Sequence, residues 1–235
     1  MEENNVNAVK QIEQMMTSAG MTLSDLISIL GKQRSTTLLL SADKHTKFVQ
    51  LYNDLENEDY SRYSKGELLE QLMDTLFSNT LFHNLRNCRT STNEIDILVE
   101  WSTNARLADI NRVFPCFGDT FICECKNYTA PVGVTYIGKF ISLLITLSTS
   151  LGIMVAWNGI TGRNSWTDSE GLIKKIALKK DIFIIVLQKD DLKRIYDQEI
   201  DILSLVSEKY TALKCDIDYT QFITKHEAED ALGAE

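Results

Sequence analysis

The fold of this 235-residue chain is decided by two short segments, Asn93-Glu94-Ile95-Asp96-Ile97-Leu98-Val99 and Phe121-Ile122-Cys123-Glu124-Cys125-Lys126. Each segment alternates with the period of two that is typical of a β-strand. One face of each is apolar, whereas Asp96 lies on the opposite face of the first segment and Glu124 and Lys126 share a face of the second. A charge inside a strand costs free energy unless another charge or a metal ion pairs with it. We therefore expect these three side chains to converge across neighbouring strands.

Two carboxylates beside an ammonium group suit the hydrolysis of a phosphodiester bond. Mg²⁺ prefers carboxylate oxygens and retained waters, and it activates a bound water while neutralising phosphate charge. In this interpretation Asp96 and Glu124 bind Mg²⁺, for which Mn²⁺ is expected to substitute. The backbone carbonyl of Cys125 is a further candidate ligand. The ammonium group of Lys126 would act on the attacking water or on the phosphate.

A third carboxylate, Glu70, completes the candidate site. The pattern Ser64-Lys65-Gly66-Glu67 is a capping box and predicts the start of a helix. The helix has a continuous apolar stripe, formed by Leu68, Leu69, Leu72, Met73, Leu76 and Phe77. Because Glu70 lies at the edge of this stripe, a helix packed on the sheet would direct its carboxylate towards the metal.

Taken in order, these residues resemble the PD-(D/E)XK nuclease superfamily, and within it the Mrr-type, restriction-endonuclease-like group. The resemblance is carried by three motifs and by the sequence that follows them: Gly66-Glu67-Leu68-Leu69-Glu70, Glu94-Ile95-Asp96, Glu124-Cys125-Lys126, then Asn127-Tyr128, Pro131-Val132-Gly133-Val134, Gly152-Ile153 and Asn158-Gly159-Ile160-Thr161. It covers roughly residues 60 to 195. The resemblance implies that Glu70, Asp96, Glu124 and Lys126 are catalytic.

The chain departs from the pattern of the superfamily in two places. Ile95 stands where the pattern has a proline before the aspartate, and the long gap between Asp96 and Glu124 implies an insertion over about 104–118. A second interpretation also competes. Glu124 and Lys126 taken alone would be an ordinary surface ion pair, and Glu70 a solvated helix residue. The ordered set of charges favours a site, because clustered ionisable groups mark functional positions more often than single ones do.

Composition narrows the class of protein. With 44% hydrophobic residues the chain resembles a soluble globular protein. Residues 140–157 carry no charge, but their serines, threonines and glycine favour a buried helix, a turn and a strand over a membrane span. Five cysteines without a Cys-x-x-Cys motif suit the reducing cytoplasm. The three histidines are scattered along the chain, which argues against a zinc cluster.

Charge is unevenly distributed along the chain. The net charge is −9, yet residues 61–180 carry 13 basic and 11 acidic side chains, a balance of +2. Three of those acids are the candidate metal ligands, so a bound metal would leave this region more positive. The acidic ends would limit non-specific binding to nucleic acid.

The pattern of elements predicts an α/β fold with a mixed central sheet flanked by helices. Strands are expected over about 81–87, 94–101, 119–126, 152–157 and 182–187, and helices from Ser64 and over about 134–148, 168–179 and 190–196. By resemblance, this α-β-β-β-α-β order is the restriction-endonuclease-like core. We assign the nuclease domain to residues 61–196. Residues 197–235 would form a helical and acidic tail.

Residues 1–60 are expected to form a helical extension, with helices over 6–16, 23–30 and 47–55. This extension would dimerise the chain, regulate it, or bind a protein or ligand. Candidate contacts with substrate are Asn127, Tyr128, Lys139, Thr161 and Arg163. The last two belong to a Gly-rich loop that could hold a phosphate or simply connect a strand to a helix.

The sequence thus predicts a Mg²⁺-dependent endonuclease acting on DNA, which by resemblance serves restriction or anti-phage defence. We expect a homodimer, because cutting both strands commonly needs two sites, and no membrane association. A structure-specific repair or recombination nuclease and an RNA-cutting enzyme are alternatives on the same fold. A non-catalytic nucleic-acid-binding or scaffolding module is an alternative of another class.

Overall fold

The structure is a computed structural model that describes residues 14–22, 25, 40–57, 59–89, 94–107, 109–162 and 167–215. The chain divides into two compact units, Met1–Leu39 and Leu40–Glu235. In the first unit residues 14–18 are helical. Most of the helices predicted over 6–16 and 23–30, and the acidic end of the chain, lie outside the described residues.

A five-stranded mixed sheet forms the centre of the second unit, in the order β1-β2-β3-β4-β5. The strands are β1 (Phe82–Arg89), β2 (Glu94–Trp101), β3 (Thr120–Lys126), β4 (Leu151–Ala156) and β5 (Phe183–Leu187). β1, β2 and β3 pair antiparallel, whereas β3, β4 and β5 pair parallel. The predicted α/β class with a mixed sheet is confirmed, and the ends of each strand lie within two residues of those predicted.

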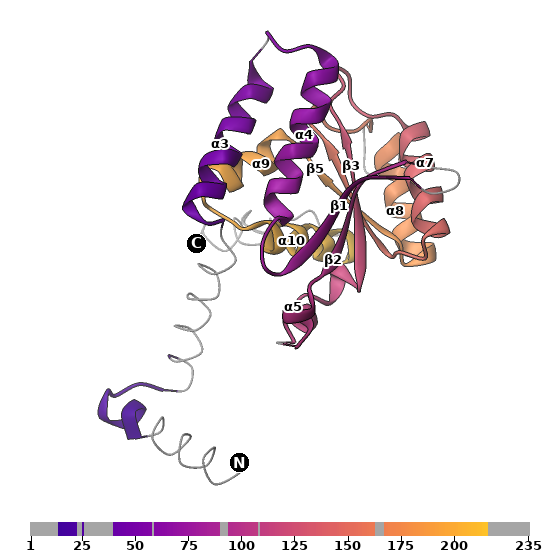
Figure 1. Cartoon of the computed structure of the whole chain (residues 1–235). Helices are drawn as coiled ribbons and strands as arrows, with labels where there is room; N and C mark the ends of the chain where they lie inside the picture. Colours follow the sequence, from indigo (N-terminus) through magenta and orange to yellow (C-terminus); the bar gives the residue numbers. More distant parts are fainter. Residues whose placement is uncertain are drawn as a thin grey trace, which may run out of the picture. The chain divides into compact units, whose positions relative to one another are not determined.

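Helices cover both faces of this sheet (Figure 1). On one side, α3 (Ala42–Glu56) packs against α4 (Arg62–Phe77), and α4 contacts β1, β2 and β3. On the other side, α7 (Val134–Thr146) contacts β4, and α8 (Asp168–Lys180) contacts α7 and β5. Near the end of the chain, α9 (Lys189–Tyr196) contacts α3, and α10 (Ile202–Cys215) packs on β5 and α8.

Two of these helices lie outside the nuclease domain assigned from sequence. α3 belongs to the stretch assigned to an extension, but it is part of the compact unit that begins at Leu40. Four residues of α3 are buried, namely Phe48, Leu51, Tyr52 and Leu55. α10 belongs to the stretch assigned to a tail, and its Leu205 and Val206 are also buried. Both helices therefore contribute to the core around the sheet.

The helix that carries Glu70 starts earlier than the sequence predicted. α4 begins at Arg62, and its N-cap is Ser61, whose hydroxyl accepts a hydrogen bond from the N–H of Ser64 at 3.2 Å. The capping box expected from Ser64 is therefore wrong. A serine three residues upstream takes the capping position, which adds residues before Ser64 to the helix. The apolar stripe of the helix is buried as predicted from Leu69 onwards.

The insertion between β2 and β3 folds into three short helices, which are α5 (Thr103–Leu107), α6 (Ile110–Val113) and the 3₁₀ helix η1 (Pro115–Phe117). The indole N–H of Trp101 donates to the carbonyl of Gly118 at 2.9 Å. Phe117 is fully buried, and its ring lies 5.0 Å from that of Phe121. These contacts return the chain to the sheet in position to form β3.

The uncharged stretch 140–157 forms the end of α7, a turn, and all of β4, as expected. None of the helices in the described parts of the chain is long and apolar enough to cross a membrane. All five cysteines are free thiols.

Candidate functional site

The site is built where the ladder between β2 and β3 ends. Backbone pairing runs from Glu100↔Thr120 to Ile97↔Cys123. Beyond that pair the side chain of Asp96 replaces a backbone partner, because the N–H of Cys125 donates to Asp96 Oδ2 at 2.7 Å. The bond fixes the carboxylate between the two strands. The second carboxylate oxygen of Asp96 takes no part in that bond, so a carboxylate held this way keeps an oxygen for a ligand.

Lys126 joins the two strand carboxylates. Its Nζ lies 2.5 Å from Glu124 Oε1 and 3.6 Å from Asp96 Oδ2. Glu124 and Lys126 point to the same side of β3 because they are two residues apart. The three side chains are 16–19% exposed, so the cluster is largely buried but open to solvent. The structure thus brings together the three charges that the sequence placed on neighbouring strands.

Glu70 reaches this cluster from α4. Its Oε2 is 3.3 Å from Nη2 of Arg86, a residue of β1. Partial burial raises the pKa of Glu70, and the negative charge of Asp96 raises it further, while Arg86 and Lys126 oppose the shift. Glu70 is therefore within electrostatic reach of both Asp96 and Lys126.

Arg86 is a site residue that sequence reasoning missed. The signal was an arginine inside a predicted strand, next to a strand that carries Asp96. A lone arginine in an edge strand usually faces solvent, so this signal was weak.

Lys126 compensates part of the negative charge of the two strand carboxylates. Burial and the neighbouring Asp96 raise the pKa of Glu124, although Lys126 acts in the opposite direction. Burial alone would lower the pKa of Lys126, but the two carboxylates outweigh burial and hold this pKa above its usual value. At neutral pH Lys126 is therefore an ammonium ion, and it occupies the position between the carboxylates that a metal cation would compete for.

The donor set fits a hard divalent cation only in part. No group of three or more His, Cys, Asp or Glu side chains within the described ranges is arranged to hold a metal ion. Mg²⁺, however, is commonly held by one or two carboxylates and several waters. Asp96 and Glu124 can supply that pair if the ammonium of Lys126 moves aside. The Cys125 peptide, whose N–H binds Asp96, lies in the same corner, so its carbonyl stays a candidate ligand.

The residues predicted to contact substrate fall in the loops after β3 and β4 and on α7, apart from one outside the described residues. Asn127 is half-buried and Tyr128 is exposed directly after Lys126. Lys139 is exposed on α7. The hydroxyl of Thr161 is hydrogen-bonded to Ser169 Oγ at 2.9 Å, which ties it to the packing of its loop. Arg163 lies outside the described residues.

The Gly-rich loop after β4 instead supports the loop after β3. Asn158 Nδ2 donates to the carbonyl of Tyr128 at 2.7 Å. The N–H of Val132 donates to the carbonyl of Gly159 at 2.8 Å, and that of Thr161 donates to the carbonyl of Val132 at 3.0 Å. These bonds fix the backbone that follows Lys126.

The chain was also compared with known proteins. No protein-family model matches it, and a search of curated protein sequences found no match.

Proposed function

We propose that the chain is a metal-dependent endonuclease with a restriction-endonuclease-like core, acting on DNA. The observation that carries the proposal is the placement of Lys126 between Asp96 and Glu124 at the end of two adjacent strands. A purely structural ion pair needs one partner for each charge. Here two carboxylates share one ammonium, and a third carboxylate lies within their electrostatic field.

Each residue has a distinct role in this proposal. Asp96 and Glu124 would hold Mg²⁺, which when bound activates water and neutralises charge on the phosphate. Lys126, released from Asp96, would donate hydrogen bonds to a phosphate oxygen or orient the attacking water. Glu70 would add negative charge behind the metal, and Arg86 would hold Glu70 in place.

A catalytically inactive binding module is the competing function. The ion pairs with Lys126 favour it, because they partly neutralise both carboxylates without a metal. An RNA-cutting enzyme or a repair nuclease would use the same residues as the DNA nuclease. The substrate that is cut, rather than the geometry of the site, distinguishes these two enzymes from the proposed DNA endonuclease.

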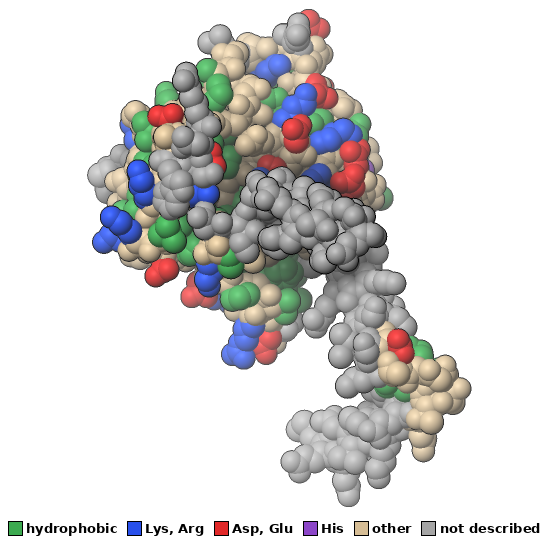
Figure 2. All heavy atoms as spheres, turned by 180° about the vertical axis from the view of Figure 1, so that it is seen from behind, with side chains coloured by type: hydrophobic (Ala, Val, Ile, Leu, Met, Phe, Trp, Pro, Cys, Tyr) green, Lys and Arg blue, Asp and Glu red, His purple; other side chains and the backbone are tan. Residues whose placement is uncertain are grey.

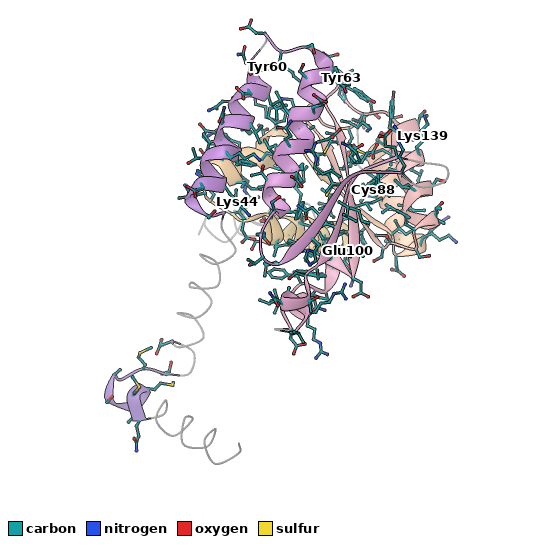
Figure 3. The ribbon with its side chains drawn as sticks, in the orientation of Figure 1. Lys44, Tyr60, Tyr63, Cys88, Glu100 and Lys139 are labelled. Atoms are coloured by element: carbon teal, nitrogen blue, oxygen red, sulfur yellow. The ribbon has the colours of Figure 1, made fainter. Side chains whose placement is uncertain are left out.

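The test is incubation of the purified protein with supercoiled plasmid in Mg²⁺, Mn²⁺ or EDTA. We expect nicking or linearisation with either metal, and none in EDTA. Asp96→Ala and Glu124→Ala should each abolish it, whereas Glu100→Ala, near the far end of the same β2 strand, is the matched control and should retain it (Figure 3). Wild-type rates in folded Asp96→Ala protein would refute the assignment. Linear, branched and RNA substrates in the same assay separate the alternatives.

The homodimer that the sequence predicts is part of the proposed function. Breaking both strands of a duplex requires two cuts, and a symmetric pair of subunits supplies two sites. Sedimentation of the metal-loaded protein with and without DNA measures the oligomeric state directly.

A further inference from the structure

Two exposed tyrosines lie in contact beside the candidate site. Tyr128 is 38% exposed and Tyr136, in the first turn of α7, is 40% exposed. Their ring centroids are 5.2 Å apart with an interplanar angle of 54°. Tyr128 follows Lys126 by two residues, which can span at most roughly 7 Å. The aromatic pair therefore adjoins the charged cluster.

The backbone beneath this pair is fixed. The carbonyl of Tyr128 accepts a hydrogen bond from Asn158, and Val132 bridges to Ile160 in the loop after β4. Tyr136 lies on a regular helix of 13 residues. Rigid aromatic side chains lose little conformational entropy when they bind a ligand, which makes them effective contact surfaces.

Positive charge accompanies the rings. Lys139 Nζ lies 5.8 Å from the centre of the Tyr136 ring, and Figure 3 shows Lys139 projecting from α7. Aromatic faces next to cationic side chains are the combination with which proteins bind single-stranded nucleic acid, since bases stack on the rings while cations meet the phosphates.

Charge elsewhere on the surface is arranged differently. In the view of Figure 2, basic and acidic side chains lie next to one another. Among the described residues away from the tyrosines, ion pairs join Arg194 to Glu208 and Lys193 to Asp197.

We propose that Tyr128 and Tyr136, with Lys139, form a base-stacking platform, and that the site acts on nucleic acid with an unpaired base beside the phosphate to be cut. The inference rests on the proposed function, and it names the substrate class as single-stranded. In an intact duplex the faces of the bases are covered by their neighbours, so a protein ring reaches a base face only when that base is unstacked.

The experiment measures binding by the full-length protein in EDTA, where no cleavage occurs. The probes are oligonucleotides of about 16 nucleotides as single-stranded DNA, single-stranded RNA and blunt duplex DNA. We expect single strands to bind at least about tenfold more tightly than the duplex. Tyr128→Ala and Tyr136→Ala should each weaken single-strand binding by about 5- to 150-fold, the range expected for losing one stacked base. A 2-aminopurine base in the probe should report stacking through quenched fluorescence.

Controls separate stacking from folding and from charge. Tyr128→Phe and Tyr136→Phe keep the ring and should bind within about threefold of the parent. Leu178→Ala removes an apolar side chain of α8 that is 59% exposed and should change nothing. Lys139→Gln should lower the salt dependence of binding, whereas Lys179→Gln, exposed on α8, should not.

Three results would overturn the platform: equal affinity for duplex and single strand, equal losses in the phenylalanine and alanine variants, or unchanged 2-aminopurine fluorescence. The difference in affinity between the DNA and RNA probes shows whether the platform prefers deoxyribose or ribose. If the proposed function is wrong and the platform is right, binding will still depend on the two tyrosines, but no metal will produce cleavage. Metal-dependent cleavage of duplex without any single-strand preference would keep the nuclease and remove the platform.

Discussion

Lys126 is the residue on which the electrostatics of the site depend, because its ammonium lies between two carboxylates that otherwise face each other. Replacing it with methionine keeps most of the length of the side chain and removes the charge. Breaking a buried ion pair by removing one partner costs about 3 kcal/mol or more, and the partial exposure of this cluster places Lys126→Met at the low end.

The same substitution separates metal binding from chemistry. Without the ammonium, Asp96 and Glu124 should bind Mg²⁺ at least as tightly as in the parent, because the competing cation is gone. Cleavage should be lost, since nothing replaces the ammonium at the phosphate. Calorimetric titration and thermal unfolding with and without Mg²⁺ measure both effects. Loss of metal affinity in a folded Lys126→Met protein would show that Lys126 organises the ligands instead.

Glu124 makes stability depend on pH in the metal-free protein. Burial and Asp96 raise its pKa in the folded state. A carboxyl group whose folded-state pKa is raised favours folding while it is protonated, and this contribution is lost as the pH rises through the raised value. Glu124→Gln stays neutral. The free energy of unfolding of Glu124→Gln in EDTA should therefore improve relative to that of the parent as the pH rises above about 4, the ordinary range of a glutamate pKa.

Urea unfolding of the two proteins at several pH values tests this prediction. If instead the parent gained free energy of unfolding relative to Glu124→Gln as the pH rose, the ion pair with Lys126 would outweigh the burial of Glu124. Adding Mg²⁺ should make the parent more stable than Glu124→Gln, because only the parent retains both carboxylates that would bind the metal.

Part of this residue-scale arrangement was predictable. The spacing Glu124-x-Lys126 places both side chains on one face of any strand, and Asp96 occupies the preceding strand in the sequence. The bond from the Cys125 amide to Asp96 was not predictable, because it depends on where the β2–β3 ladder ends. The pair of Arg86 and Glu70 depends likewise on the register of β1 and on the rotation of α4.

At the scale of elements, the close approach of α7 to β4 sets the layer that carries Tyr136 and Lys139. Gly152 permits that approach. A Cβ built there would lie 2.6 Å from Phe140 Cε1 and 2.9 Å from Leu144 Cδ1, both on α7. We predict that Gly152→Ala destabilises the protein by about 1–3 kcal/mol through overpacking.

Gly138, within α7 itself, is the matched control. A Cβ at that position meets nothing within 4 Å. Gly138→Ala should therefore stabilise the protein by about 0.5–1 kcal/mol, because alanine restricts the unfolded chain and favours the helix. Chemical denaturation of both variants measures whether each substitution raises or lowers the free energy of unfolding. Equal changes in stability in the two variants would show that α7 moves freely over β4.

The element boundaries show where sequence patterns succeed and where they fail. Strands were placed within two residues because alternating apolar residues, as in β2, and continuous apolar runs, as in β4 and β5, are local signals. The start of α4 was wrong because Ser61 and Ser64 both fit an N-cap, and local pattern does not choose between them. α3 was placed in an extension because its packing partners, such as Trp157 and Tyr196, are more than a hundred residues away.

At the scale of the whole molecule, two deletions compare the boundary at residue 40 with the boundary that the sequence suggested at residue 60. Removing residues 1–39 takes away one compact unit and none of the second. Removing residues 1–60 also takes away α3. Phe48 and Tyr52 of α3 are almost fully buried, and the Tyr52 ring lies 5.2 Å from that of Trp157.

We predict that the protein beginning at Leu40 unfolds cooperatively at nearly the temperature of the full chain and keeps any metal-dependent cleavage. The protein beginning at residue 61 should lose several kcal/mol, because each large core side chain removed costs about 2–5 kcal/mol. With a typical total of about 5–15 kcal/mol, it should not fold stably. Circular dichroism, thermal unfolding and sedimentation measure fold, stability and oligomeric state together. A folded, active protein beginning at residue 61 would show that α3 is dispensable, whereas a dimer present only in the full chain would assign association to the first 39 residues.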